Sequence, residues 1–298
     1  MKFFTKHFTV LFLAIISPVF GQYVFNSLDI PSSVRGLALM NGGSAVNSSV
    51  LGNNPASLGI NGKFLSIQYL IFPADITSHQ FHFSTHTKRG SVSTVISIID
   101  FGDLSDSVTG ESFSARDLVL KVGYKSIWKN RLSWGITTGA IRSKIQQYEA
   151  SGLFIDFGIR SRFFNNRFGI GISSENLGKM VTLYSDIPES FDRQFRYALY
   201  YKPLHLPATI SIDYLVSKTL TPLLITALEF ELSSGTLIWI SSNSEKNSLT
   251  WGSILNTLTS GIAGGVRLPI STFTIDAGFQ NMGSAGIVWG FGIGKQLN

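Results

Sequence analysis

The sequence predicts an all-β protein: an antiparallel transmembrane β-barrel of about 14 strands, preceded by an N-terminal, plug-like segment that is not part of the barrel. Three observations predict this fold: few charged residues, an export signal, and segments in which apolar side chains occupy every second position. Charged residues make up 14% of the 298-residue chain, against about 25% in typical soluble proteins. Much of the surface is therefore expected to contact outer-membrane lipid rather than water.

The first 21 residues have the pattern of a signal peptide. Lys2 and Lys6 precede a short apolar core at 8–16, Pro18 follows this core, and Gln22 is expected to start the mature chain. The alternative is a membrane anchor, but a spanning helix needs about 20 apolar residues and this core is shorter. No run of about 18 apolar residues follows it, so the sequence predicts no transmembrane helix.

Period-two alternation is the main evidence for strands. Leu153, Ile155 and Phe157 alternate with Asp156 and Gly158, for example. The same pattern recurs at 132–137, 168–173, 210–214, 273–280 and 287–293. Alternation places bulky apolar side chains on one face and small or polar ones on the other, as in strands of about 9–11 residues that cross a membrane. Because unpaired sheet edges are costly in lipid, such a sheet must close.

The strand count follows from the segments after Lys63. Fourteen or fifteen segments qualify, with 248–256 the doubtful one, and an even number is expected for a bacterial single-chain barrel, which favours 14. Short links are expected at the periplasmic end and longer ones outside. The short links are 87–90, 127–130 and 163–166, and the longer ones are 102–113 and 178–193. A large soluble β-sandwich or propeller is the alternative, and the low charge and the export signal disfavour it.

The alternation also assigns the two faces of the barrel. The residues expected to face lipid include Trp134, Phe157, Phe168 and Phe279, and those expected to face the interior include Asp156, Arg160, Asp213 and Asp276. Arginine at a lipid-facing position such as Ile155 should be costly, whereas Gly158→Arg on the interior face is expected to be tolerated.

Residues 22–62 lack the alternation and are rich in glycine and asparagine. Two interpretations are open: a loose periplasmic tail, or a plug inside the barrel lumen. The expected organisation is therefore a signal peptide at 1–21, this periplasmic or plug segment at 22–62, and an outer-membrane barrel at 63–298.

Sequence motifs for chemistry are weak. The glycines at 290–294 superficially resemble a phosphate-binding loop, but no helix can follow them. His79, His82 and His86 would share a face only on a helix, and on a strand His82 and Ser84 point into the lumen, away from lipid. The acidic residues Asp100, Asp103, Asp106 and Glu111 lie around an expected exposed loop with the wrong spacing for an EF-hand.

These observations predict a protein that is not an enzyme, with no catalytic residues, no cofactor and no metal site. The formal net charge of +6 is spread along the chain without a basic run, so no nucleic-acid partner is expected. The absence of cysteine excludes disulfides and thiolate metal sites.

Several segments resemble a known family. They are 25–28, 31–43, Asn54-Pro55-Ala56 with Leu58, Phe72-Pro73-Ala74-Asp75, 100–117, 151–156 and 176–178. Together they are similar to the PorV/PorQ family, and to PorQ in particular, over about residues 22–215. Members of that family are FadL-like outer-membrane barrels associated with type IX secretion.

The resemblance implies a barrel that acts through protein partners: other components of a type IX-like secretion and surface-attachment system, or secreted cargo. The competing function is FadL-like transport of hydrophobic small molecules across the outer membrane, and a general diffusion porin is a third. The candidate partner or plug residues are Arg35, Gly36, Gly42, Gly43, Asn54 and Pro55. Glycines permit backbone conformations closed to other residues, and Asn54-Pro55 favours a fixed turn.

Overall fold

A computed structural model describes residues 22–23, 25–105, 110–128, 131–185, 189–219, 221–247 and 259–297 of the chain. The expected signal peptide at 1–21 and the doubtful segment at 248–256 lie outside these residues. Within the described part of the chain, no helix is long and apolar enough to cross a membrane.

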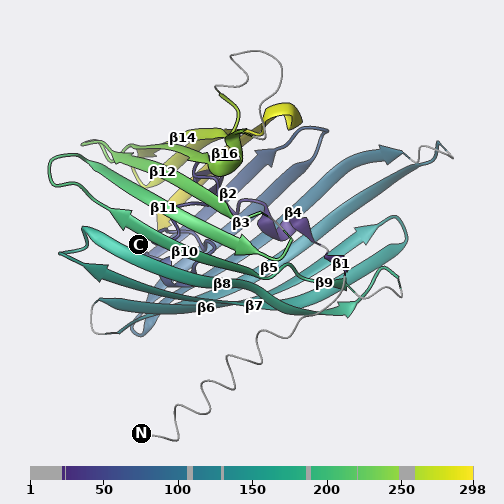
Figure 1. Cartoon of the computed structure of the whole chain (residues 1–298), viewed down its shortest axis with the longest axis horizontal. Helices are drawn as coiled ribbons and strands as arrows, with labels where there is room; N and C mark the ends of the chain where they lie inside the picture. The colour runs from purple at the N-terminus through teal and green to yellow at the C-terminus, as the bar shows by residue number, and fades with distance from the viewer. Residues whose placement is uncertain are drawn as a thin grey trace, which may run out of the picture.

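Fourteen of the described strands form one closed antiparallel barrel, which confirms the predicted fold class and strand number (Figure 1). The barrel strands are β2 (Lys63–Ile71), β3 (Thr77–Thr87), β4 (Gly90–Ser105), β5 (Ser112–Trp128), β6 (Leu132–Ile145), β7 (Tyr148–Phe163), β8 (Phe168–Thr182), β10 (Gln194–Tyr201), β11 (Ala208–Ser217), β12 (Leu223–Glu231), β13 (Leu237–Asn243), β14 (Ile262–Ile270), β15 (Phe273–Asn281) and β16 (Ile287–Leu297). Pairing of β16 with β2 closes the sheet, so no barrel edge is left open to lipid.

Loop lengths orient the barrel. Tight turns join β3 to β4, β5 to β6, β7 to β8 and β14 to β15 at one end, which is therefore the periplasmic end. The longer connections from β8 to β10 and from β13 to β14 lie at the other end, which faces outward. The predicted long link at 102–113 is wrong, because β4 continues to Ser105 and β5 begins at Ser112.

The two faces of the wall carry the side chains that the alternation predicted. On the outer face, Trp134 and Phe157 are 44% and 47% exposed, and Phe279 is exposed as well. The interior side chains Asp156, Arg160, Asp213 and Asp276 are all buried. His82 and Ser84 are also buried on the lumen side. Bulky apolar groups thus meet lipid, while the charges lie inside.

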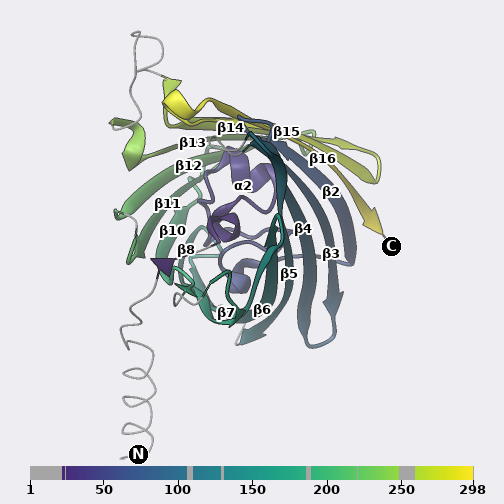
Figure 2. The ribbon, with the colours of Figure 1, turned by 90° about the vertical axis from the view of Figure 1, so that its right-hand side faces the viewer.

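The lumen is filled by residues 25–62, which we call the plug. It contains three short helices: η1 (Asn26–Asp29), α2 (Val34–Ala38) and η2 (Pro55–Ser57). Figure 2 shows α2 inside the barrel, enclosed by the strands. The chain enters near the outer end, where β1 (Gln22–Tyr23) pairs with β9 (Glu189–Ser190), and leaves at the periplasmic end, where β2 begins. The interpretation as a loose periplasmic tail is therefore wrong.

Glycines on the inner wall provide the space that the plug occupies. A Cβ on Gly135 would lie 2.5 Å from the backbone carbon of Pro55, and one on Gly290 would lie 2.8 Å from the Leu37 side chain. Gly158 likewise packs against Asn54 and Pro55. The expectation that Gly158→Arg would be tolerated is therefore wrong, because this interior position faces plug atoms rather than water.

Substitution of Ile155 by arginine is expected to destabilise the folded barrel in lipid by about 2–4 kcal/mol, because the side chain faces the membrane. Thr209→Arg is the matched interior control, since Thr209 points into an open cavity of the lumen. Urea titrations of both variants folded into vesicles measure the difference. Equal destabilisation at the two positions would contradict the assigned faces.

Candidate functional site

The candidate residues in the first part of the plug contact the barrel wall. Arg35 lies in α2, and its Nε donates to a Glu229 carboxylate oxygen at 2.8 Å. Trp239 Nε1 donates to the same oxygen at 2.7 Å, so this contact joins the plug to β12 and β13. Both Arg35 and Glu229 are largely buried, and their opposite charges stabilise each other in a region with little water.

Gly36 lies in α2, and its N–H donates to the Ser33 side chain that caps this short helix. Gly42 lies against Ile225 of β12, where an added Cβ would approach that side chain to 2.8 Å. Gly43 has a φ of 70°, a region that glycine adopts without strain, and its N–H donates to the Asp213 carboxylate at 2.7 Å. The two glycines thus allow the plug to approach β11 and β12 closely.

Asn54 and Pro55 dock on another part of the wall, formed by β6, β7 and β8. Asn54 caps η2 by accepting from the Ala56 N–H at 3.0 Å, and Pro55 occupies the first position of this helix. Ser133 of β6 donates to the Ala56 carbonyl at 3.1 Å. Every candidate residue therefore lies inside the lumen, where it positions the plug.

A cavity of about 280 Å³, which we call the upper chamber, lies on the outward side of the plug against β10–β12. Its plug side includes Ile30 and Met40, and its wall side includes Leu215, Leu223 and Ile225. Further lining residues are Asn26, Asp29, Pro31, Asn41, Asn53, Phe72, Gln194, Arg196, Asn243, Glu245, Gln280 and Met282. The chamber therefore combines an apolar interior with polar groups.

Several of these polar groups form hydrogen bonds. Arg196 is fully buried, and its guanidinium donates to Glu175 at 3.0 Å and to the Asn41 carbonyl at 3.2 Å. Gln194 donates to the Asp29 carboxylate at 2.7 Å. Asp29 borders the chamber, and burial within the barrel raises its pKa from 3.8 to about 6, an effect that the Gln194 hydrogen bond partly offsets.

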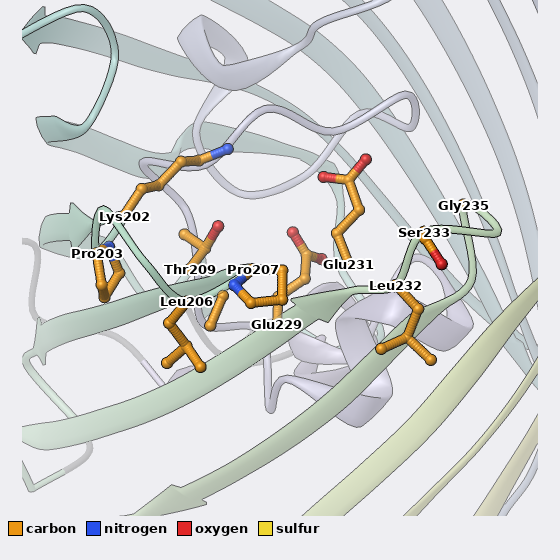
Figure 3. A pocket seen from close by; sticks show the side chains of 11 residues that line it. Lys202, Pro203, Leu206, Pro207, Thr209, Glu229, Glu231, Leu232, Ser233 and Gly235 are labelled. Carbon is orange, nitrogen blue, oxygen red and sulfur yellow. The ribbon is translucent and has the colours of Figure 1, made fainter.

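A second cavity, which we call the lower vestibule, lies at the periplasmic end and has a volume of about 830 Å³. It lies between the turn from β10 to β11 and the turn from β12 to β13. Figure 3 shows Lys202 and Glu231 extending from these turns, with Thr209 and Glu229 between them. Glu229 is the partner of Arg35, so the vestibule reaches to the underside of the plug.

The wall itself is irregular between β7 and β8. The register shifts between Ile155 and Phe157, where Asn176 adopts a φ of 60° and its N–H donates to Asp156 at 2.8 Å. Such a shift is a β-bulge, which locally disrupts the ladder. A mainly apolar groove of about 600 Å³, lined by Leu153, Ile155, Leu177 and others, lies beside it.

Some residues considered in the sequence do not form a site. Among the residues that the structure describes, no group of three or more His, Cys, Asp or Glu side chains is arranged to hold a metal ion. His79 is exposed, whereas His82 is buried in the lumen. Asp100 pairs with Arg116 of β5, and Asp106 lies outside the described residues.

Sequence reasoning missed the residues of both cavities. Arg196 and Glu229 stand at alternating, lumen-facing positions, which is a usable signal for an interior charge. Nothing local to Asp29, Leu223 or Ile225 distinguishes them from other barrel or loop residues, because the chamber exists only once the plug is seated.

These features define a class of protein: a transmembrane β-barrel closed by an internal plug, with one cavity above the plug and one below it. The plug is held to the wall by the buried ion pair of Arg35 with Glu229 and by close contacts at glycines.

The chain is similar in structure to several solved proteins. One is the toluene transporter TodX of Pseudomonas putida, with a TM-score of 0.61 and 9% identity over 94% of this chain and 100% of that one. Another is the toluene transporter TbuX of Ralstonia pickettii, with a TM-score of 0.61 and 12% identity over 89% and 98% of the two chains. A Pseudomonas aeruginosa FadL homologue has a TM-score of 0.59 and 8% identity over 93% and 100%.

No protein-family model matches the chain, and no curated protein matches it in sequence. At these identities, the structural similarity concerns the fold. The chain has a FadL-like barrel fold and is an outer-membrane protein, as predicted. The proteins that it resembles are transport channels rather than enzymes, which agrees with the prediction of a non-enzymatic protein.

Proposed function

We propose that this protein transports small hydrophobic molecules across the outer membrane. The observation that carries the proposal is the upper chamber, a partly apolar cavity that lies inside a membrane barrel and borders its plug. The FadL-like fold supports it, because solved barrels of this fold include toluene transporters.

The size and lining of the chamber indicate the substrate class. Its volume of about 280 Å³ is near the lower end of the roughly 300–1,000 Å³ typical of small-molecule sites, which favours compact molecules over long chains. Leu215, Leu223 and Ile225 supply apolar contact, whereas Arg196 is already neutralised by Glu175. A compact molecule with a largely uncharged, apolar surface fits this lining best.

Binding of a fluorescent apolar probe, such as 1-N-phenylnaphthylamine, to the protein in nanodiscs tests the proposal. Leu223→Asp is expected to weaken binding about tenfold, because it replaces apolar lining with a charge. Leu204→Asp is the matched control, since this exposed leucine lies in a periplasmic turn outside the chamber. Equal affinities of the wild-type protein and Leu223→Asp would contradict the proposed site.

The proposed function also predicts a pH dependence. Because the pKa of Asp29 is raised to about 6, its carboxyl group is neutral below this pH and charged above it. A neutral carboxyl group in the chamber lining favours an apolar ligand, so the probe should bind severalfold more tightly at pH 5 than at pH 7.5. Asp29→Asn should bind tightly at both values. A variant that retained the full pH dependence would show that another group is responsible.

A second candidate function is the one that the sequence resemblance implies: a barrel of a type IX-like secretion system that acts through protein partners. The observation that favours it is the close packing of the plug, whose segment 38–46 covers the wall between the two cavities. A scaffold needs no passage through its lumen. The candidate residues would then act indirectly, by keeping the barrel closed.

A further inference from the structure

We propose that the plug turn at 40–44 is a gate between the upper chamber and the lower vestibule, and that substrates leave to the periplasm along β10–β12 when it opens. This inference rests on the proposed transport function, which it deepens by assigning an exit route and the residues that close it.

The upper chamber lies above the lower vestibule along the same strands, β10–β12. Along β12, the upper chamber includes Leu223 and Ile225, whereas the lower vestibule includes Glu229 and Glu231. Ile225 and Glu229 are four residues apart, which at about 3.3 Å per residue corresponds to about 13 Å along the strand. The neighbouring strands show the same order, because Leu215 and Arg196 line the chamber while Thr209 and Lys202 line the vestibule.

The plug occupies the intervening level. Register pairs Asp213 with Ala198 and Ile225, and Ser211 with Tyr200 and Ala227, so these residues form the wall between the cavities. Ser44 donates from its N–H at 3.1 Å and from its hydroxyl to the Asp213 carboxylate. Ala45 and Val46 pack on Ala198 and Tyr200, and Leu39 belongs to the cluster that includes Ala227.

The turn is held in a conformation that depends on these wall contacts. Met40, Asn41 and Gly43 have φ values of 52°, 60° and 70°. Glycine and asparagine tolerate this left-handed region, whereas it is unfavourable for Met40. Three groups on the wall offset this strain: Asp213 holds Gly43 and Ser44, Arg196 binds the Asn41 carbonyl, and Glu229 binds Arg35. Weakening one of these anchors should therefore release the turn rather than unfold the barrel.

Opening the turn would join two existing cavities without altering the wall. The turn is held by hydrogen bonds to Asp213 and Arg196 and by packing of Met40 against Ile225. The ion pair of Arg35 with Glu229 anchors the preceding helix at the rim of the vestibule, so a displacement of a few residues removes the barrier. The competing exit is the groove beside the bulge at Asn176, which would require passage through the wall between β7 and β8.

Single-channel recording of the full chain in planar bilayers tests the gate without relying on transport of any substrate. Asp213→Asn is expected to increase the open probability about tenfold or more, because it converts charge-assisted hydrogen bonds into neutral ones. Asp276→Asn is the matched control, since this buried carboxylate pairs with Arg267 of the wall. Ser44→Ala, a mild change on the plug side, should also increase opening, and it decides the result if Asp213→Asn fails to fold.

The route is tested by modifying the vestibule. Because the chain has no cysteine, a Thr209→Cys substitution offers a single thiol inside the vestibule. When this cysteine is combined with Asp213→Asn or Ser44→Ala, the gate variants, its modification by a bulky charged methanethiosulfonate reagent should abolish their current. The same modification should also abolish uptake of 1-N-phenylnaphthylamine into vesicles that contain the Thr209→Cys protein with an otherwise unchanged gate. A matching cysteine at Thr138, in the wall groove, should have no effect on either.

The outcomes separate the gate from the proposed function. Current that responds as described without probe uptake would support the gate and overturn the transport proposal. Probe uptake that is insensitive to modification at 209 but sensitive at 138 would support transport and overturn the gate, in favour of exit through the wall. Folded gate variants with unchanged current would also overturn it.

Discussion

Removal of residues 22–60 is expected to convert a barrel with little stable conductance into an open pore. The wall closes through pairing of β16 with β2 and does not require the plug to complete its hydrogen bonds. A barrel of 14 strands is too wide for its own inward side chains to fill, since interiors outgrow them beyond about eight strands. The plug supplies the missing material, and its loss leaves a polar, water-filled lumen.

Planar-bilayer recording of the full-length and truncated proteins measures this change. Heat-modifiable gel mobility serves as the control that the truncated barrel has folded. A folded truncated protein with the same low conductance as the full chain would show that wall side chains or loops, rather than the plug, close the lumen.

Gly135→Ala is expected to displace the second half of the plug. An added Cβ would lie 2.5 Å from the Pro55 carbonyl carbon and 2.7 Å from the Ala56 nitrogen, and these backbone atoms cannot move aside as a flexible side chain could. Such overpacking costs about 1–3 kcal/mol. The hydrogen bond from Ser133 to Ala56 should weaken at the same time, because it depends on the same close approach.

Hydrogen exchange at 54–58 measures the effect, and faster exchange with an intact barrel is the expected result. Gly264→Ala is the matched control, since this strand glycine faces outward. An added Cβ there would have the movable Phe279 ring and the Trp239 carbonyl oxygen as its nearest neighbours, both at 3.3 Å, well beyond the 2.5 Å approach at Gly135. If residues 54–58 exchanged as slowly in Gly135→Ala as in the wild type, the result would contradict a role of the wall glycines in making room for the plug.

The barrel could be predicted from the sequence because its pattern is a direct consequence of the membrane. Lipid requires bulky apolar groups at every second position, as at Ile155 and Phe157, and the alternate positions are free to be small or polar. The extent of β4 and β5 is harder to predict, because both strands continue into the region expected to form a long link. Residues at these strand ends need not follow the alternation of apolar and polar side chains that lipid requires.

The interior was harder to predict because it is shaped by the plug. Gly135 and Gly158 look like ordinary small lumenal residues until Pro55 and Asn54 are placed against them. Arg35 could be selected as a candidate, but its partner Glu229 is 194 positions away and no local signal connects the two. The plug itself has short helices and irregular turns, which is why its sequence is also compatible with a loose tail.

Residues that carry the family resemblance also have a structural role in this protein, whether or not the resemblance holds. Gly43 and Asn54 hold the plug at two different places on the wall, β11 and β7–β8, inside the barrel rather than on an exposed surface. Buried positions of this kind are suited to controlling a passage. A secretion partner would have to contact the protein elsewhere, and the two functions therefore predict different phenotypes.

The central proposal, transport of small hydrophobic molecules, is tested most directly by deleting the gene and measuring two phenotypes in the same strain. Uptake of a radiolabelled monoaromatic hydrocarbon is measured alongside surface display of secreted proteins. The transport proposal predicts reduced uptake, restored by the wild-type gene but not by one encoding Leu223→Asp, with surface display unchanged. Normal uptake together with lost surface display would contradict it, and would instead support a role in secretion.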